Sequence, residues 1–227
     1  LQFPLANLIY IFPTMATLDN LPVLSDSQRN RSNAVKKLVV SSIQNSKNGV
    51  IGFDEFMEIV LYTENLGYYD AGDKIFGKDG DFLTAPSSGQ LFGECVANEL
   101  APVLDSLDCN ILEFGAGGGD LAKSVCSALG EFHDFHSYAY HIIEPNESLW
   151  VDQRTATKDL SGGFFWHKSL PRDLSKGVLI ANEVLDAMPA TRYLVDKGTV
   201  QELGVALSGQ ELVWKEKSTD VPEQIKR

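Results

Sequence analysis

The feature that most constrains the fold is a short apolar run that leads from Asn110 through Glu113 into Gly115, Gly117 and Gly119. A turn from a strand into a helix uses glycine where the backbone takes a positive φ angle or where a ligand must approach without meeting a Cβ atom. The amides of such a turn point outward at the start of the next helix. The pattern therefore predicts an α/β fold with a loop that binds a nucleotide-type cofactor.

The spacing of these glycines separates three kinds of cofactor loop. The dinucleotide fingerprint G-x-G-x-x-G/A needs glycine or alanine where Asp120 stands, and this carboxylate would lie close to a bound pyrophosphate. The phosphate-binding loop G-x-x-x-x-G-K-[ST] does not occur here, because no lysine directly follows the glycines. The remaining pattern, E-x-G-x-G-x-G, is similar to motif I of methyltransferases that use S-adenosylmethionine, a cofactor without phosphate. The structural alternative is a glycine turn that permits close helix packing.

A second acidic residue ends the next predicted strand, where the apolar run 138–143 leads into Glu144 and Pro145. In doubly wound sheets such a residue accepts hydrogen bonds from the ribose hydroxyls of the cofactor, usually about 20 residues after the glycines. Glu144 lies 29 residues after Gly115, so the intervening helix and loop must be longer than usual. Glu144 is the candidate ribose-binding residue, with a solvated glutamate before a proline turn as the alternative.

Composition and charge limit the classes of function. The 227 residues are 44% hydrophobic, which is typical of a globular protein. The formal net charge of −12 argues against a nucleic-acid partner and would suit a basic one. Cys95, Cys109 and Cys126 form no C-x-x-C pair, which favours buried thiols in a reducing compartment over disulfides or zinc. His133 and His136 have no third ligand nearby, so we expect no metal site.

Residues 1–14 are apolar and uncharged, and Met15 is a plausible start. A membrane-spanning helix needs about 20 apolar residues, and Pro4, Asn7 and Pro13 interrupt this run. Basic residues, typical of secretion signals and mitochondrial presequences, are absent from it. We therefore expect a tail or a start-site artefact and no membrane span. The expected location is cytoplasmic, or the mitochondrial matrix if the source is eukaryotic.

Residues 15–109 are predicted to form a helical region that contains one long loop. Apolar residues recur at helical spacing over 35–43 and over 53–61, and a third helix is expected from Leu91 to about Pro102. Residues 67–86 are glycine-rich and lack periodicity, and loops this long inside a compact domain are usually functional. We expect this loop to contribute to the cofactor site.

Five segments carry a family resemblance: Gly80-Asp-Phe-Leu-Thr-Ala-Pro86, Gln90-Leu-Phe-Gly-Glu94, the glycine loop 113–119, Ile143-Glu-Pro145 and Ala181-Asn-Glu-Val-Leu-Asp-Ala-Met-Pro189. In this order they resemble the MidA-like methyltransferases over about residues 49–195. The resemblance implies a class I methyltransferase fold, with a Rossmann-like α/β sheet, that uses S-adenosylmethionine. For a mitochondrial member needed for complex I assembly, it implies symmetric dimethylation of an arginine in a complex I subunit.

The expected cofactor-binding residues come from the glycine loop, the second strand end, the long loop and the fourth strand end. They are Glu113, Gly115, Gly117, Gly119, Glu144, Gly80, Asp81, Thr84, Pro86 and Asn182. The sequence departs from the family pattern at a few places. Ser87-Ser88 stands where the family usually has Glu-Ile, and Ala116, Gly118 and Asp120 replace the usual Pro, Arg and Thr.

Two more carboxylates follow the fourth predicted strand, residues 176–182. Ligands of open α/β sheets bind beyond the carboxyl ends of the strands, so Glu183 and Asp186 are expected where an acceptor would meet the methyl donor. An arginine guanidinium stays protonated at ordinary pH. A carboxylate can hold it bidentately and localise its charge, which leaves one nitrogen more nucleophilic. Glu183 is the first candidate for this catalytic role, and Asp186 either assists it or caps a following helix.

Asn182 and two histidines near these strand ends are the remaining candidates for ligand contacts. Enzymes that methylate the amino groups of bases carry two prolines and an aromatic residue after the strand, whereas Asn182 is followed by Glu-Val-Leu. His167, beside Trp166, is either a cofactor contact or ordinary packing. His141 is expected to be a core or edge residue.

Residues 191–227 change to alternating strands with hairpin signals at 196–198 and 208–209, which predicts a small β extension. The α/β core, residues 110–190, supplies four sheet strands, whereas a complete class I sheet has seven. The fold is therefore expected to be C-terminally incomplete, and an exposed fourth strand would favour association with another chain, for example as a homo-oligomer.

Three hypotheses for the function remain open. The first is an S-adenosylmethionine-dependent methyltransferase that modifies arginine in a protein acceptor with a basic segment. The second is a methyltransferase that acts on a small molecule. The third is a non-catalytic assembly or interaction protein that retains the fold, which the Ser87-Ser88 departure favours.

Overall fold

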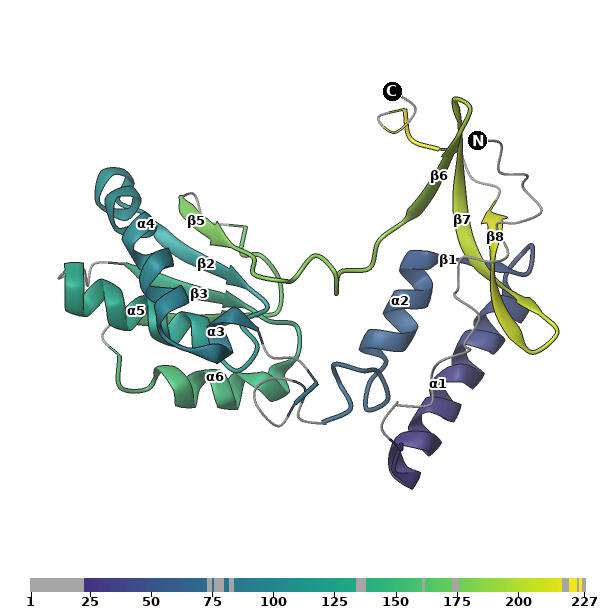
Figure 1. The fold of residues 1–227 in the computed structure, drawn as a ribbon, viewed down its shortest axis with the longest axis horizontal. Coiled ribbons are helices and arrows are strands. Elements are labelled where there is room, and N and C mark those ends of the chain that lie inside the picture. Colours follow the sequence, from purple (N-terminus) through teal and green to yellow (C-terminus); the bar gives the residue numbers. More distant parts are fainter. Residues whose placement is uncertain are drawn as a thin grey trace. The chain divides into compact units, whose positions relative to one another are not determined.

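The structure is a computed structural model, and it forms two compact units (Figure 1). Unit 1 holds the described residues up to Ala71 together with those from Met188 onward, and unit 2 holds Gly72–Ala187. These units divide the chain differently from the boundaries expected at 109/110 and 190/191. The expected tail, residues 1–14, lies outside the described residues, which are 23–72, 75, 80–81, 84–133, 138–160, 162–172, 176–217, 221–223 and 225.

Unit 2 is built on a sheet of four parallel strands, as the sequence predicts. The strands lie in the order β4-β3-β2-β5. Their bounds are β2 Asn110–Phe114, β3 Ala139–Ile143, β4 Gly163–His167 and β5 Gly177–Ile180. The central strands β2 and β3 are the most buried, which explains why their sequences read as nearly continuous apolar runs.

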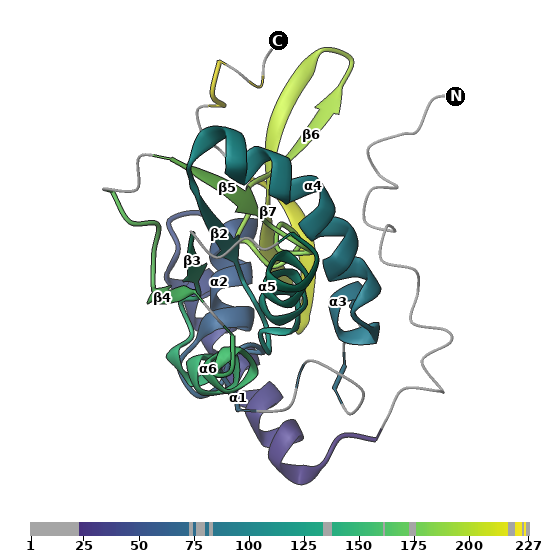
Figure 2. The same cartoon turned by 90° about the vertical axis from the view of Figure 1, so that its left-hand side faces the viewer.

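Helices pack against this sheet, and α5 Asp120–His133 lies between α4 Leu91–Leu107 and α6 Trp150–Thr157 (Figure 2). The prediction that α4 ends near Pro102 is wrong, because the helix continues through it to Leu107. Proline removes one backbone hydrogen bond, but Leu104 beyond it is fully buried in the core, and this burial favours continuation. Two short helices, α3 Ala85–Ser88 and the 3-10 helix η2 Glu147–Leu149, complete unit 2.

Unit 1 combines the N-terminal helices with the predicted β extension. Strand β7 pairs antiparallel with β6, β8 and a short strand β1. The three-residue β1 was not predicted, because it is too short to show a period. Val39, Ile43, Ile51 and Val205 form the core of this unit. The elements are α1 Asp26–Asn45, β1 Val50–Gly52, α2 Phe53–Tyr62, β6 Arg192–Asp196, β7 Thr199–Ser208 and β8 Glu211–Lys217.

None of the helices within the described ranges combines the length and the apolar character that a bilayer crossing requires.

The contact between α4 and α5 depends on Gly93, and this generates a stability prediction. A Cβ atom at Gly93 would overlap the Oγ and Cβ atoms of Ser124 on α5; the hydroxyl can rotate, but the Cβ atom cannot move without shifting the helix. Gly93→Ala gains about 1 kcal/mol of helix propensity, but the overlap is expected to produce a net destabilisation of about 2 kcal/mol. Urea unfolding measures the change. Glu99→Ala, on the exposed side of α4, is the matched control, and equal stabilities of the two variants would contradict the prediction.

Candidate functional site

The glycine loop joins β2 to α5 and approaches its neighbours at two places. Gly115, Gly117 and Gly119 all have positive φ angles, of 61°, 53° and 89°. A Cβ atom at Gly115 would lie 3.1 Å from Val184 Cγ2, and one at Gly119 would lie 3.1 Å from Gln153 Cα. The loop is thus wedged between the segment that follows β5 and helix α6, so conformation and packing both require glycine here.

The outer part of the loop leaves room for a ligand. A Cβ atom at Gly118 would meet only Asp120 Oδ2, at 3.8 Å, among the described atoms. Asp120 begins α5, so its carboxylate already lies at the helix end that attracts negative charge. A phosphate would meet this carboxylate, whereas a cofactor with a positive charge and no phosphate fits. The residues present therefore suit S-adenosylmethionine better than a dinucleotide.

Glu144 lies at the carboxyl end of β3, one residue beyond the strand, as predicted. Its side chain is buried, with 6% exposed, and its Oε1 accepts a hydrogen bond from the Asn146 amide at 3.0 Å. The Gln153 Nε2 atom approaches Oε2 at 3.5 Å. Burial raises the pKa of Glu144, and the bonds from Asn146 and Gln153 oppose this rise. Glu144 is held in one orientation by protein groups.

Glu113 is buried inside unit 2, with 2% of its surface exposed, rather than at the sheet edge. The Tyr140 hydroxyl, from the neighbouring strand β3, donates to Glu113 Oε2 at 2.8 Å. The pKa of Glu113 is raised from 4.5 to about 7, mainly by burial and also by the charge of Glu144, while the Tyr140 hydrogen bond opposes this rise. The two acidic residues of the predicted cofactor site are therefore electrostatically coupled.

The segment after β5 carries the predicted catalytic carboxylates. Glu183 is exposed and has a φ angle of 53°, which is unusual for a residue with a side chain. Val184, the next residue, lies against Gly115, so the segment borders the glycine loop. Asp186 is exposed in a turn that the hydrogen bond from the Ala187 amide to the Val184 carbonyl closes at 3.1 Å. The proposal that Asp186 caps a helix is wrong, because residues 176–217 contain no helix.

Asn182 lies between β5 and Glu183 and is partly exposed. Its position at the strand end agrees with the prediction, and its contact with a cofactor stays a prediction.

The long loop 67–86 divides into two differently placed parts. The amides of Tyr68 and Tyr69 donate to the Val60 and Leu61 carbonyls of α2, at 3.0 and 2.9 Å, so the start of the loop belongs to unit 1. Its end forms helix α3, which packs against α4 and α5 in unit 2.

Thr84 precedes α3 and Pro86 lies in its first turn, so both stand beside the helix that follows the glycine loop. The Thr84 carbonyl accepts hydrogen bonds from the Ser87 and Ser88 hydroxyls, at 2.9 and 3.0 Å. Gly80 and Asp81 form a bend, and their flanking residues 76–79 and 82–83 lie outside the described part. Their roles stay predictions.

His141 on β3 and His167 on β4 contact each other, and packing explains their positions. His141 Nδ1 and His167 Nε2 are 2.9 Å apart, and the His141 ring stacks on Phe165 with a centroid distance of 5.1 Å. His141 is buried, as expected. This pairing occupies one ring nitrogen of His167 and favours the packing alternative for it. Within the described ranges no group of three or more His, Cys, Asp or Glu residues is arranged to hold a metal ion.

Two of the three cysteines are buried thiols, as the sequence predicts. Cys109 and Cys126 are buried, and burial raises the pKa of the Cys126 thiol to about 12, so it stays protonated. Cys95 is exposed, so the expectation of a buried thiol is wrong at this position. It lies on the outer side of α4.

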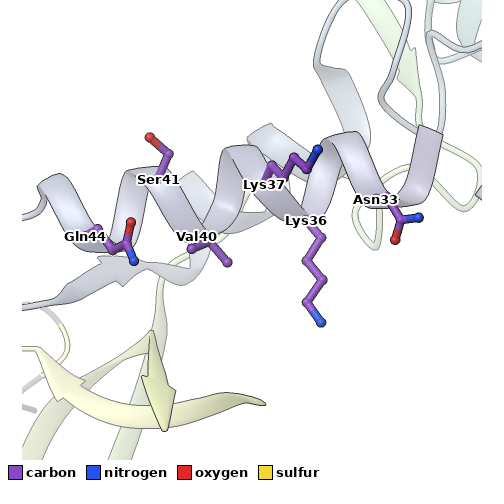
Figure 3. Close-up of a pocket in the computed structure, with 6 residues that line it drawn as sticks. All are labelled: Asn33, Lys36, Lys37, Val40, Ser41 and Gln44. Carbon is purple, nitrogen blue, oxygen red and sulfur yellow. The ribbon is translucent and has the colours of Figure 1, made fainter. Parts of the chain in front are cut away.

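A hollow of about 400 Å³ lies along α1 in unit 1, far from these motifs in sequence (Figure 3). Its side chains come from successive turns of one helix, and none is a predicted site residue. They are Asn33, Lys36, Lys37, Val40, Ser41 and Gln44.

Two residues of the site were not predicted, Gln153 and Tyr140. Both side chains are almost fully buried, and their polar groups bond to other polar groups of the site. Tyr140 lies in an apolar strand, where a tyrosine is ordinary. Gln153 lies in a mostly polar helix, where nothing in the pattern distinguishes it from exposed neighbours.

The buried carboxylate of Glu113 predicts a specific pH dependence of stability. Because the pKa of Glu113 is higher in the folded state than in the unfolded state, protonation of Glu113 stabilises the folded state. This contribution is fully present below about pH 4.5 and is lost as the pH rises through 7. The free energy of unfolding should therefore fall between pH 4.5 and 7.5 by about 3 kcal/mol relative to Glu113→Gln. Urea unfolding of both proteins across this range measures the difference. A constant difference would contradict the raised pKa, and Tyr140→Phe should shift the transition to higher pH.

Comparisons with known proteins identify the family of the chain. The family model for S-adenosyl-L-methionine-dependent methyltransferases matches residues 95–226. The chain is 30% identical to "Protein arginine methyltransferase NDUFAF7 homolog, mitochondrial" of Caenorhabditis elegans, over 72% of this chain and 44% of that protein. It is 28% identical to the protein of the same name from Drosophila melanogaster, over 68% of this chain and 41% of that protein. The chain thus spans less than half the length of these curated relatives.

A solved structure is similar as well. A COG1565 superfamily member from Burkholderia thailandensis, bound to S-adenosyl-homocysteine, is 29% identical and superposes with a TM-score of 0.76. The match covers 90% of this chain and 55% of that one. The predicted family, its α/β fold and its cofactor class are thereby confirmed. The chain belongs to the MidA-like family of S-adenosyl-L-methionine-dependent methyltransferases.

Proposed function

We propose that the protein containing this chain methylates arginine in a protein acceptor, and that this chain supplies the cofactor-binding part of the enzyme. Two relatives with the name protein arginine methyltransferase support the arginine acceptor. The glycine loop, open at Gly118, and the carboxylate of Glu144 support the binding of S-adenosylmethionine beside the ends of β2 and β3.

The observation that carries the proposal is the contact between the Glu183 segment and the glycine loop. Val184 lies against Gly115, so the residue before it, Glu183, stands beside the cofactor loop at the carboxyl end of the sheet. Its backbone is held at a φ angle of 53°, which costs about 1 kcal/mol for a residue with a Cβ atom. Strain of this kind persists only where the surrounding structure holds it, and it is frequent at functional sites.

The proposed chemistry uses the residues of this chain for binding and orientation. When bound, the cofactor would supply the methyl group of its sulfonium to an incoming nitrogen, so that the S–C bond breaks, S-adenosylhomocysteine leaves and the methylated nitrogen releases one proton to solvent. Glu144 accepts hydrogen bonds from the ribose hydroxyls, and the glycine loop admits the ligand next to its backbone. The exposed Glu183 carboxylate accepts two hydrogen bonds from the guanidinium of the acceptor and localises its positive charge. Holding one guanidinium nitrogen in line with the methyl group contributes most of the rate through positioning.

The proposed acceptor and location follow from charge and from the relatives. A net charge of −12 would attract an acceptor with a basic segment. The named relatives are mitochondrial proteins, so we propose the mitochondrial alternative in place of the cytoplasm.

Glu183→Gln tests the acceptor site. In the protein that contains this chain, methyl incorporation into arginine should fall by about a hundredfold, because the amide no longer carries the charge that orients the guanidinium. The affinity for S-adenosylhomocysteine should change less than about twofold, since Glu183 contacts the acceptor rather than the cofactor. Tritium transfer to extract proteins, with dimethylarginine identified by mass spectrometry, measures the first effect. Calorimetry measures the second.

The control for this experiment is Glu131→Gln, an exposed glutamate on α5. Unchanged arginine methylation by Glu183→Gln would contradict the role of Glu183. Methyl transfer by the wild type only to small molecules would replace the proposed acceptor. Cofactor binding without any methyl transfer would favour a non-catalytic role.

Glu144→Gln tests the ribose contact. A neutral amide accepts weaker hydrogen bonds than a carboxylate, so the affinity for S-adenosylhomocysteine should fall by about tenfold. Calorimetry measures this loss. The matched control is Glu147→Gln on η2, whose exposed carboxylate pairs with Lys168 at 2.9 Å. If both variants bind as the wild type does, Glu144 is not the ribose-binding residue.

A further inference from the structure

Gln153 is the most completely buried polar side chain of unit 2, with 0% exposed, although it lies on a mostly polar helix. Three groups surround its carboxamide. The Nε2 atom donates to the Gly117 carbonyl at 3.0 Å and approaches Glu144 Oε2 at 3.5 Å. The Trp166 indole Nε1 donates to Gln153 Oε1 at 3.0 Å. One side chain on α6 therefore contacts the glycine loop, the end of β3 and strand β4.

The orientation of this carboxamide follows from the chemistry of its partners. An indole N–H can only donate, so the oxygen of Gln153 must face Trp166. The Gly117 carbonyl and the Glu144 carboxylate can only accept, so the amide nitrogen must face them. Both hydrogens and the oxygen are directed at partners that match them, and no other uncharged side chain has this set of groups at this length.

The backbone of α6 adds a second constraint at the same place. Gly119 approaches Gln153 Cα so closely that a Cβ atom there would lie 3.1 Å away. The Thr157 hydroxyl donates to the Gln153 carbonyl at 2.9 Å. The position of Gln153 is therefore determined by its helix, and the glycine loop packs directly on it.

Glu144 is oriented from both sides. Its Oε1 accepts from the Asn146 amide, and its Oε2 faces the Gln153 amide. The Trp150 indole also donates to the Glu144 carbonyl, at 3.1 Å. Gln153 is the group that joins this carboxylate to the glycine loop, because its single nitrogen contacts both Gly117 and Glu144.

We propose that Gln153 is a positioning residue that holds the glycine loop and Glu144 at the separation required by the adenosyl part of the cofactor. This rests on the proposed function, in which both motifs contact that ligand. Gln153 acts without touching the reacting atoms. Its loss lowers cofactor affinity through the loop and the carboxylate, not through the acceptor.

Gln153→Glu tests the proposal with nearly the same shape. The introduced carboxylate still accepts from Trp166, but its second oxygen faces the Gly117 carbonyl and the Glu144 carboxylate and repels both. Dissociation constants for S-adenosylhomocysteine, measured by calorimetry, should rise about tenfold or more at pH 8. Two adjacent buried carboxyl groups share a proton at lower pH, and that proton restores a donor. The ratio of variant to wild-type dissociation constants should therefore fall toward 1 at pH 6.

Urea unfolding of Gln153→Glu at both pH values separates this effect from a purely structural one, because a variant that is fully folded at pH 8 and still binds weakly has lost positioning rather than structure. The matched control is Gln44→Glu, at an exposed glutamine on α1, which should bind as the wild type does at both pH values (Figure 3). A pH-independent ratio, or a ratio near 1 at pH 8, would overturn the proposal.

Trp166→Phe provides a second test of the role of Gln153 if Gln153→Glu fails to fold. This variant keeps an aromatic ring but removes the indole donor that orients the Gln153 oxygen, together with part of the ring that packs against the core and under Arg154. It should weaken S-adenosylhomocysteine binding about threefold to tenfold, and unchanged binding would then contradict the role of Gln153. If the wild-type protein binds no S-adenosylhomocysteine, the proposed function itself fails, which is a different outcome from normal wild-type binding with unaffected variants.

Discussion

The close packing of the glycine loop is the constraint on which the rest of the site depends. Gly115 has Val184 against it and Gly119 has α6 against it, and a Cβ atom at either position would make a tight contact of 3.1 Å. Three elements that are remote in the sequence thereby meet at one turn. A Cβ atom at either position would strain the positive φ angle and push the neighbouring segment outward by a few tenths of an ångström, so the packing of the site depends on glycine at both places.

Buried acidic groups are the second property of the site, and they oppose stability. Glu113 and Glu144 are both almost fully buried, and burial raises both pKa values. Tyr140 supports Glu113, while Asn146 and Gln153 support Glu144. Each carboxylate thus has protein donors, which reduces the cost of burying charge near a sheet end. A cationic ligand would reduce it further, which agrees with the chemistry of the family cofactor.

Much of the fold could be predicted from the sequence, because its strongest signals are local. The apolar runs of β2 and β3 predicted parallel strands, and the glycine spacing predicted the loop between β2 and α5. The continuation of α4 past Pro102 could not be predicted, since it depends on burial of Leu104 against other elements. The packing of the N-terminal helices with β7 and β8 depends on contacts between residues more than a hundred positions apart.

The residues of the candidate site could be predicted where a residue type at a given place in the fold usually has one function. Glycines in a strand-to-helix turn and acidic residues at strand ends are of this kind. Gln153 is not, because a glutamine in a polar helix is usually exposed, and only the Gly117, Glu144 and Trp166 contacts distinguish it.

The backbone conformation of Glu183 predicts different outcomes for selection on stability and selection on activity. Glycine and asparagine adopt a φ angle of 53° more readily than glutamate does. A library of variants selected only for thermal resistance should therefore lose glutamate at this position, whereas one selected for methyl transfer should keep it under the proposed role. Sequences sampled from the two libraries would show at a single position whether evolution preserved the side chain for its chemistry or tolerated it by chance.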